Sequence, residues 1–298
     1  MGLTNPKVLV VLVNWNGWAD TIECLESCSS LAYPNYELVV VDNGSTDDSV
    51  ERITGHSPAT RIICTGVNLG FAGANNVAIR EALDRDFGFV WLLNNDTAVD
   101  SAALGALVET AEADPTVGVV GSKIYYHSQP DVLWFAGGFI NRTKGYAYHR
   151  GAEETDVGQY DVAGPVEYVT GASMLVRVDA IRQVGVMAES YFLYWEEADW
   201  NARIARAGWR TIYQPRSIVW HKVGRSTGNE DNPVRARYNG RNRILYFQRN
   251  QPARAFLVTI MTLAQSAWLC LRGKPAVGIA QARGVLDALL GRSGYIAP

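Results

Sequence analysis

The amino-acid sequence predicts an α/β protein built on a mainly parallel central sheet flanked by helices. Short apolar runs alternate with helical segments through the first 94 residues, and polar side chains follow the runs. Strands that are buried on both faces of a parallel sheet have such continuous apolar runs. The chain has 298 residues, 48% of them hydrophobic, which is enough for a substantial core.

The first half of the chain alternates strands with helices. Helices are expected over about 18–30 and 72–86, and another is expected to open at Ser45-Thr46-Asp47-Asp48, which resembles a capping box with first-turn acids. The predicted strands are KVLVVLV (7–13), YELVVVD (36–42), RIICT (61–65) and GFVWLLN (88–94).

The second half is less regular. Residues 134–151 predict a hairpin or loop excursion, and residues 166–178 predict a strand with a bend at Gly171. A helix is expected from near Trp195 to Gly208, because glycine is favoured just past a helix end. Cys24 and Cys28 lie one helical turn apart, which predicts two buried thiols and a reducing, cytoplasmic environment.

Polar side chains follow the predicted strands of the first half. Each of these residues alone suits a turn or a helix cap. Because the carboxyl ends of parallel strands meet at one edge of a sheet, their repetition predicts a binding crevice there. The segments are Asn14-Trp15-Asn16, Asp42-Asn43-Gly44, Asn68-Leu69-Gly70 and Asn94-Asn95-Asp96.

Two acidic groups carry the predicted chemistry. Asp96 follows a buried strand and suits Mg²⁺ or Mn²⁺, although capping of a helix that starts near Ser101 is slightly favoured by this segment alone. Glu196, Glu197 and Asp199 crowd three carboxylates between aromatic residues, which should raise a pKa toward a value useful for proton transfer.

Helical spacing places Glu196 and Asp199 on the same face as Arg203, so a pairing of both with Arg203 would leave Glu197 free to act as a base. The alternative is a solvated helix start whose acids complement the helix dipole. His221 follows an apolar strand; it is either structural or part of a metal site with Asp96, with Lys222 or Arg225 near phosphate oxygens.

The C-terminal region differs from the rest in charge. Residues 233–298 contain ten Lys or Arg and one acid, a net of +9, which leaves −12 for the rest of a chain of net −3. The apolar stretch 255–271 is shorter than the ~20 residues of a spanning helix. Contact with an anionic membrane surface and packing on the domain or a dimer partner are about equally expected. Nucleic acid is not expected, because no binding motif accompanies the basic residues.

Six ordered motifs then identify a resemblance. VVLVNWNG, VVVDNGSTDDS, NLGFAGANN, WLLNNDT, YVTGASMLVRVDAIRQVG and YFLYWEEADWNARIARAGW follow one another along the chain. Over residues 6–250 the sequence resembles the family 2 glycosyltransferases, particularly the bacterial rhamnosyltransferase-like members. The resemblance implies a GT-A (Rossmann-like) catalytic domain over 1–230 and a basic, amphipathic helical extension over 231–298.

The resemblance also implies roles for individual residues. Asp96 would hold Mg²⁺ or Mn²⁺ with His221 and Asn94, where Asn94 replaces the first aspartate of the family's DxD motif. Glu197, where aspartate is common, would be the general base beside Glu196. Trp195, Asp199 and Gly171 would contact the acceptor or support the site. The donor nucleotide would bind at Asn14, Asn16, Asp42, Asn43, Asn68, Gly70, Asn75, Asn95 and Arg225.

The implied activity is an inverting, metal-dependent sugar transfer at the cytoplasmic face of the plasma membrane. The expected donor is dTDP-L-rhamnose, with a UDP-hexose as its competitor, and the expected acceptor is a lipid-linked glycan or polysaccharide. A homodimer is a further expectation. A sugar-phosphate nucleotidyltransferase would need a basic loop after the first strand, which residues 14–20 do not offer. A non-catalytic binding protein would be expected to lack the acids that are present here.

Overall fold

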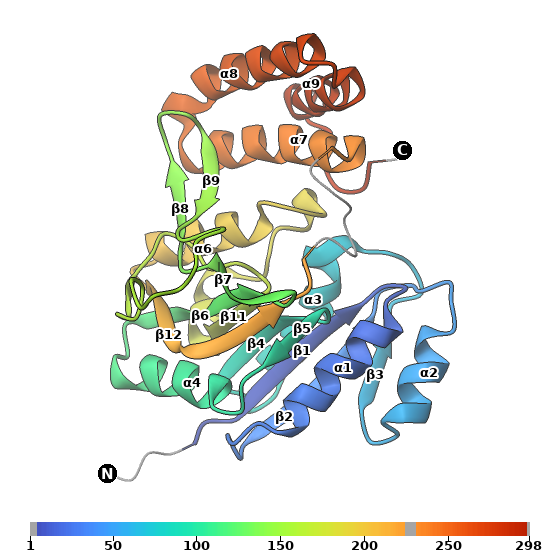
Figure 1. Ribbon diagram of the computed structural model, residues 1–298, viewed down its shortest axis with the longest axis vertical. Coiled ribbons are helices and arrows are strands. Elements are labelled where there is room, and N and C mark those ends of the chain that lie inside the picture. Colours follow the sequence, from blue (N-terminus) through green and yellow to red (C-terminus); the bar gives the residue numbers. More distant parts are fainter. Residues whose placement is uncertain (1–4, 224–230, 297–298) are drawn as a thin grey trace.

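The computed structural model describes residues 5–223 and 231–296. Within these ranges the core is a ten-stranded sheet whose main path runs β10-β12-β6-β11-β4-β1-β2-β3 (Figure 1). The four strands of the first half are mutually parallel along β4-β1-β2-β3, which confirms the predicted sheet. They are β1 (Val8–Asn14), β2 (Tyr36–Asp42), β3 (Arg61–Cys64) and β4 (Phe89–Asn94).

Helices connect these strands as predicted. They are α1 (Trp18–Ser29), α2 (Ser49–His56) and α3 (Gly70–Asp84). Alternate residues of β1 face opposite sides, so that Val8, Val10 and Leu12 belong to one core cluster while Leu9 and Val11 belong to the other. The strand is therefore buried on both faces, which explains why its sequence is apolar throughout.

The rest of the sheet is mixed. Its elements are β5 (Thr97–Val99), α4 (Ala103–Ala113), β6 (Val117–Tyr126), β7 (Gln129–Phe135), β10 (Gly164–Pro165), β11 (Ser173–Arg177) and β12 (Arg210–His221). β11 runs antiparallel to β4 and β6, whereas β12 runs parallel to β6. β12 also pairs with β5, with His221 opposite Thr97, and this register brings His221 next to Asp96.

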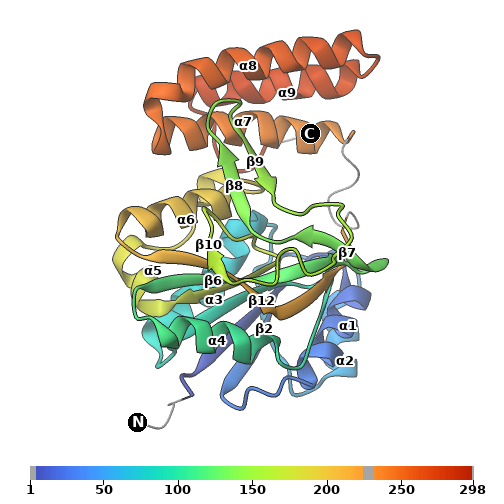
Figure 2. The same ribbon diagram turned by 60° about the vertical axis from the view of Figure 1, so that its left-hand side comes forward.

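A hairpin and two helices complete this part of the chain. The predicted hairpin forms from β8 (Gly138–Asn141) and β9 (Tyr146–His149), and it rises from the sheet toward the C-terminal helices (Figure 2). α5 (Val178–Val184) and a short 3₁₀ turn (Glu189–Tyr191) precede α6 (Glu196–Arg206). Gly208 has a φ of 96° just past α6, as expected for the residue after a helix end.

The C-terminal helices form a layer at one end of the sheet (Figures 1 and 2). They are α7 (Pro233–Asn250), α8 (Pro252–Leu271) and α9 (Pro275–Leu289), and α7 lies nearest the sheet. Among the described residues, α8 is the one helix whose length and apolar composition would suit a membrane span. Most of α8 is exposed; Val258, Thr262 and Ser266 are its buried residues.

Two local predictions were wrong. The helix expected at Ser45-Thr46-Asp47-Asp48 does open at the end of that segment, with Asp48 as N-cap and α2 beginning at Ser49, but the capping box is wrong, because the Ser45 hydroxyl donates to Asp42. Asp96 does not cap the next helix, because β5 intervenes and α4 begins at Ala103. Ser45 instead bonds to Asp42 and Asn14 at the strand ends, and Asp96 pairs with His221. The predicted pair of thiols is confirmed, since Cys24 and Cys28 are buried and free.

Gly70 provides a test of how the first half supports the site. Its φ is +73°, and an added Cβ would collide with the backbone oxygen of Phe192. We expect Gly70→Ala to lower the free energy of unfolding by at least about 1–2 kcal/mol, because an L-residue is strained in this conformation. Denaturant unfolding of the purified chain measures the change.

Gly105 is the matched control. It lies in α4, and an added Cβ there would meet nothing within 4 Å. Gly105→Ala should leave stability unchanged or raise it by up to about 1 kcal/mol through helix propensity. Equal effects at the two glycines would contradict this account of Gly70.

Candidate active site

The carboxyl ends of β1 and β2 are joined by a buried polar network. Asn14 donates through Nδ2 to Asp42 Oδ2 at 2.9 Å and to Ser45 Oγ at 3.1 Å. Asn14 Oδ1 accepts from the Thr21 hydroxyl at 2.8 Å. Asp42 also accepts from the backbone N–H and the hydroxyl of Ser45. The Asp42 carboxylate is thereby fixed at the sheet edge where the crevice was predicted.

Side chains at the neighbouring strand ends shape two loops. Asn16 has a φ of 52°, and its Oδ1 accepts from Thr46 N at 2.8 Å. Asn43 donates to Asn68 Oδ1 at 3.1 Å and accepts from Leu69 N at 2.8 Å, so it fixes the turn that leads into α3. Asn68 Oδ1 also accepts from the Gly70 N–H at 2.8 Å. These residues form one continuous rim, as the strand-end pattern predicted.

Two of the residues expected to bind the donor, Asn75 and Asn95, make contacts within the protein. Asn75 is buried within α3 and donates to the Phe71 carbonyl at 2.9 Å. Asn95 donates to the Thr21 hydroxyl at 2.8 Å and so ties the end of β4 to α1. In this conformation both amides make internal contacts that support the rim. Arg225 lies outside the described residues.

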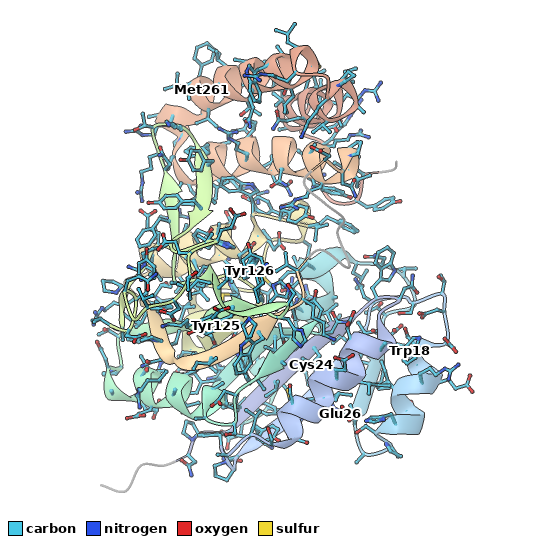
Figure 3. All side chains as sticks on the ribbon, viewed as in Figure 1. Trp18, Cys24, Glu26, Tyr125, Tyr126 and Met261 are labelled. Atoms are coloured by element: carbon cyan, nitrogen blue, oxygen red, sulfur yellow. The ribbon has the colours of Figure 1, made fainter. Side chains whose placement is uncertain are left out.

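Asp96 and His221 meet at the end of β4. His221 Nε2 lies 3.0 Å from Asp96 Oδ1 and 3.3 Å from Asn94 Nδ2, and both Asp96 and His221 are buried. Burial alone would raise the pKa of Asp96, but attraction to His221 and the hydrogen bond to its ring hold that pKa below its ordinary value. Cys24, labelled in Figure 3, lies beneath this strand end, with its sulfur 3.7 Å from the Asn94 carbonyl oxygen.

Asp96, His221 and Asn94 have the chemistry of a divalent-ion site in which a substrate supplies some of the ligands. No cluster of three or more His, Cys, Asp or Glu side chains suited to a metal occurs in residues 5–223 and 231–296. Mg²⁺ and Mn²⁺ sites at phosphates often use one or two carboxylates and leave the other positions to substrate oxygens and water. His221 Nδ1 is buried without a hydrogen-bond partner, so the ring is fixed mainly on its Nε2 side. Asp96, His221 and the amide oxygen of Asn94 therefore fit such an ion.

Lys222, one of the two residues expected near phosphate oxygens, contacts α1 in this structure. Its ammonium group pairs with Asp20 at 2.9 Å and with Glu23 at 2.5 Å, both on α1. The backbone N–H of Lys222 donates to the Asp96 carbonyl at 2.9 Å. Lys222 therefore anchors the end of β12 beside the site.

The second acidic group opens α6. Burial raises the pKa of Glu196 well above its ordinary value, and the neighbouring Glu197 charge raises it further. Burial raises the pKa of Glu197 as well, while hydrogen bonds from backbone N–H groups at the helix start oppose that rise. An oxygen of each carboxyl is buried without a hydrogen-bond partner. Both carboxyls are therefore pushed toward the protonated form, Glu196 further than Glu197.

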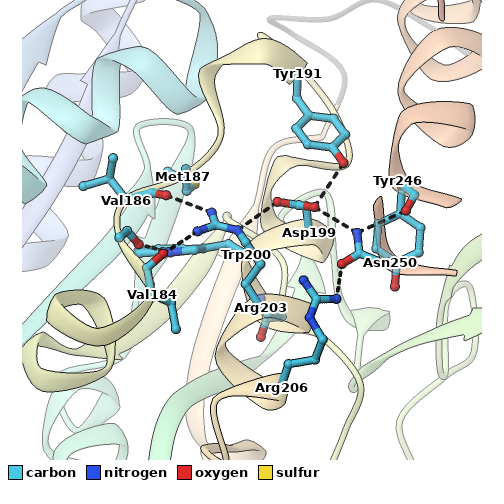
Figure 4. Close-up of polar contacts among 12 residues, drawn as sticks. Val184, Val186, Met187, Tyr191, Asp199, Trp200, Arg203, Arg206, Tyr246 and Asn250 are labelled. Atoms are coloured by element: carbon cyan, nitrogen blue, oxygen red, sulfur yellow. Dashed lines mark hydrogen bonds and ion pairs between the residues drawn. The ribbon is translucent and has the colours of Figure 1, made fainter. Parts of the chain in front are cut away.

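The predicted pairing of Glu196 with Arg203 is wrong. Arg203 instead pairs with Asp199 at 3.0 Å and donates to the carbonyls of Val184 and Val186 (Figure 4). Asp199 Oδ1 accepts from the Tyr191 hydroxyl and from Asn250 Nδ2. Asp199 is therefore structural, as expected, but Glu196 lacks the cation that was predicted for it because Arg203 is directed toward the loop before α6.

The segment that leads into Glu196 is strained. Phe192, Tyr194 and Trp195 have φ values of 64°, 69° and 74°, a left-handed conformation that costs roughly 1–3 kcal/mol for each residue other than glycine. Asn242 on α7 donates through Nδ2 to the carbonyls of Tyr191, Leu193 and Tyr194 at 2.7–2.9 Å. We call residues 191–195 the strained segment.

Further contacts hold the strained segment from both sides. Arg241 on α7 is fully buried and donates to the Tyr191 carbonyl at 2.7 Å. From the opposite side, Phe71 N donates to the Phe192 carbonyl at 2.7 Å. The sequence analysis missed Asn242 and Arg241. The sequence signals them only through the many polar residues of α7. The structure shows that this helix is mostly buried.

An aromatic layer lies between the two acidic groups. Trp134 contacts His221 and His149 edge to face, with ring centroids 4.6 and 4.7 Å apart. Burial lowers the pKa of His149 to about 4, so this ring is neutral at physiological pH. Tyr168 follows at 6.1 Å from His149, and the Glu197 charge contributes, after burial, to the raised pKa of Tyr168. The metal-suited group and the acidic pair are thus linked by packed side chains.

Gly171 lies in the turn between these groups. An added Cβ at Gly171 would collide with the Phe71 ring, so the close approach requires glycine. The adjoining Ala172 carbonyl accepts from Asn94 N at 3.1 Å, and Asn201 on α6 donates to the Val169 carbonyl at 3.4 Å. The turn at 170–172 therefore contacts both β4 and α6, which supports the structural role expected for Gly171.

Replacing Asn242 tests whether α7 holds the strained segment. We expect Asn242→Ala to lower the free energy of unfolding by about 2–4 kcal/mol, since three carbonyls lose one shared donor. Asn239→Ala is the control on the same helix, because Asn239 makes a single hydrogen bond, to the Arg235 carbonyl, and should cost less than about 1.5 kcal/mol. Similar losses for both variants in denaturant unfolding would contradict the role of Asn242.

Comparison with solved structures supports the fold. A mannosyltransferase from Pyrobaculum calidifontis, solved with GDP-Man and Mn²⁺, aligns with a TM-score of 0.62 and 16% identity over 97% of this chain and 89% of its own. GalNAc-T7, solved with UDP, GalNAc and Mn²⁺, aligns with a TM-score of 0.63 and 14% identity over 82% of this chain and 48% of its own. The fold is therefore the expected GT-A fold with a C-terminal helical extension.

Sequence comparison agrees. An N-acetylglucosaminyl-diphospho-decaprenol L-rhamnosyltransferase of Mycobacterium tuberculosis is 29% identical over 74% of this chain and 78% of its own length. A poly-beta-1,6-N-acetyl-D-glucosamine synthase of Staphylococcus epidermidis is 25% identical over 69% of this chain and 47% of its own length. The family model described as glycosyl transferase family 2 matches residues 9–185. The chain belongs to glycosyl transferase family 2 and is a rhamnosyltransferase-like glycosyltransferase.

Proposed function

We propose that this enzyme transfers L-rhamnose from dTDP-L-rhamnose, with inversion, to a hydroxyl group of a lipid-linked glycan in the synthesis of bacterial surface polysaccharide. The name of the mycobacterial relative supports both the sugar and the diphospho-lipid acceptor. A UDP-hexose is the alternative donor, which the similarity to an N-acetylglucosamine polymer synthase supports. Family membership removes the support for a nucleotidyltransferase or a non-catalytic binding protein.

The observation that carries this proposal is the pair of buried carboxyls at the start of α6. Burial holds the pKa of Glu196 further above its ordinary value than the pKa of Glu197, so Glu197 is the member of the pair that ionises more readily. Glu197 accepts the proton of the acceptor hydroxyl as its oxygen forms a bond to the anomeric carbon. The bond from that carbon to the donor diphosphate breaks on the opposite face, through an oxocarbenium-like transition state. One displacement of this kind inverts the configuration.

Donor binding is assigned to the rim at the strand ends. Asp42, fixed by Asn14 and Ser45, lies beside the exposed Asn16, and together they suit hydroxyl and amide groups of a nucleoside. Asp96, His221 and Asn94 would hold Mg²⁺ or Mn²⁺. When bound, that ion would neutralise charge on the donor diphosphate. Because Asn94 stands where a DxD motif has its first aspartate, this site is less negative than a DxD site.

The C-terminal helices supply the proposed membrane contact. α8 exposes Phe256, Leu257, Ile260 and Trp268, α9 exposes Leu286 and Leu289, and Leu290 is exposed just past its end. The same region has a net charge of +9. An apolar face with basic residues suits the anionic cytoplasmic surface of a membrane, where a lipid-linked acceptor resides. A homodimer through the same face is the competing occupant.

A donor panel tests the activity. With acceptor lipid supplied, we expect transfer from dTDP-L-rhamnose in the presence of Mg²⁺ or Mn²⁺, and loss of transfer on addition of EDTA. Transfer from a UDP-hexose alone would replace the donor assignment. Failure of every donor with each metal would contradict the proposed function, and undiminished turnover in EDTA would contradict the role of Asp96 and His221.

Substitution of each glutamate in turn tests which of the two is the general base. We expect Glu197→Gln to lower the turnover number by ~10²–10⁴-fold, as for loss of a general base. Glu196→Gln imitates the protonated acid and should stay within about tenfold of the wild type. Because the pKa of Glu197 is raised above 4.5, the wild-type rate should fall with decreasing pH at a pH above that value. Loss of transfer in Glu196→Gln with retention in Glu197→Gln would reverse the assignment.

The pH dependence of stability tests whether Glu196 binds a proton in the folded chain, independently of activity. A raised pKa in the folded state means that the folded chain binds more protons than the unfolded chain above pH 4.5. The wild-type free energy of unfolding should therefore decrease as pH rises through the interval above 4.5. Glu196→Gln should weaken that decrease, and an unchanged pH dependence would show that Glu196 is ionised in the fold.

A further inference from the structure

A cavity of about 240 Å³ lies beside the strained segment, away from the nucleotide rim. Residues from the hairpin, the start of α6 and all three C-terminal helices line it. The volume corresponds to about eight water molecules at roughly 30 Å³ each, which suits a group of diphosphate size. The lining residues that matter here are Tyr146, Trp195, Asn239, Arg243, Gln265 and Gln281.

Arg243 is the unusual member of this lining. Its side chain is buried, with 9% of the residue exposed, and its Nε has no hydrogen-bond partner. Nη1 donates to Gln265 Oε1 at 3.0 Å and Nη2 donates to the Lys144 carbonyl at 2.6 Å. Within residues 5–223 and 231–296, no carboxylate lies within ion-pair distance of Arg243.

This arrangement is unfavourable unless an anion completes it. A buried charge without a counter-ion costs several kcal/mol, and burial here lowers the pKa of Arg243 to about 10. Two half-buried arginines pair with carboxylates, Arg203 with Asp199 and Arg237 with Asp287. The fully buried Arg241 donates from Nε, Nη1 and Nη2 to Asn242 and to backbone carbonyls, whereas the Nε of Arg243 has no partner. The planar guanidinium group matches phosphate oxygens, and the amides of Asn239, Gln265 and Gln281 add donors around it.

The position of the cavity specifies which phosphate it suits. Trp195 lines the cavity and directly precedes Glu196-Glu197, so the proposed reacting hydroxyl lies on one side. Gln265 and Gln281 lie on α8 and α9, whose outer faces expose apolar side chains on the other side. A lipid-linked acceptor has the same order: a sugar hydroxyl, then a diphosphate, then an apolar chain.

We propose that this cavity binds the diphosphate group of the lipid-linked acceptor, with Arg243 as its principal ligand and Trp195 beside the acceptor sugar. The assignment rests on the proposed function for the identity of the acceptor. The presence of an anion site at Arg243 does not depend on sugar transfer, and it is tested first.

Inorganic diphosphate is the probe for the site itself. Calorimetric titration into the full chain in EDTA avoids a metal-bridged complex at Asp96. We expect the wild type to bind diphosphate, and Arg243→Gln to bind it roughly 10- to 100-fold more weakly, as for loss of a charged hydrogen-bonding partner. Arg283→Gln is the matched control, because Arg283 is exposed on α9 and its loss removes the same charge.

Three results would overturn the site. The first is that the wild type does not bind diphosphate, and the second is that Arg243→Gln binds it as tightly as the wild type does. The third result is full competition by dTDP or UDP in EDTA, which would place the diphosphate at the donor rim. Thermal unfolding of Arg243→Met adds a structural readout. Gln265 and Lys144, which contact Arg243, are exposed residues, so Arg243→Met should raise the unfolding midpoint without ligand and lose the shift caused by diphosphate. A lowered midpoint, with no diphosphate shift in the wild type, would make Arg243 a purely structural residue.

Kinetics then connects the site to the acceptor. Two acceptors with the same sugar are compared, one bearing a lipid diphosphate and one an uncharged alkyl glycoside. Arg243→Gln should raise KM roughly 10- to 100-fold for the diphosphate acceptor only, with the donor KM unchanged. An equal effect on both acceptors would overturn the acceptor assignment. Diphosphate binding that depends on Arg243 in a chain with no transfer activity would contradict the proposed function and leave the anion site standing.

Discussion

The hydrogen bonds from Asn242 to the carbonyls of residues 191, 193 and 194 are the constraint on which the site depends. The strained segment has three residues other than glycine in the left-handed region, and such a path persists only when its surroundings impose it. Those surroundings come from α7 on one side and from the Phe71 N–H on the other. The family model matches residues 9–185, and the C-terminal helices that hold the strained segment lie beyond that match.

The pKa values of the two acidic groups are shifted in opposite directions by their surroundings. Asp96 is kept ionised by His221, whereas Glu196 and Glu197 are pushed toward the protonated form by burial, to different extents. The aromatic layer of Trp134, His149 and Tyr168 lies between the two groups and carries no charge at neutral pH. Separate environments for neighbouring carboxyls are how a single site can hold a cation and also remove a proton.

The sequence predicted the features set by local periodicity and by sheet geometry. The parallel strands and the helices between them follow from apolar runs and their spacing, whereas the contact of Asp96 with His221 was one of two alternatives that the residues left open. The prediction failed where a side chain has more than one partner within reach. Ser45 binds Asp42 rather than capping a helix, and Arg203 contacts Asp199 and two carbonyls rather than Glu196. Asn242 was missed because the carbonyls to which it donates are 48 to 51 positions away, and Arg243 was missed because Gln265 and the Lys144 carbonyl are 22 and 99 positions away.

Hydrogen exchange of the backbone amides of residues 191–199 tests the central claim most directly. The account predicts that Asn242→Ala speeds exchange in this range by about tenfold or more through local opening, while amides of β1 and α3 keep their wild-type rates relative to one another. It also predicts that Asn239→Ala leaves the whole pattern unchanged. Wild-type exchange at residues 191–199 in Asn242→Ala would contradict the claim that α7 holds the strained segment and thereby positions Glu196 and Glu197.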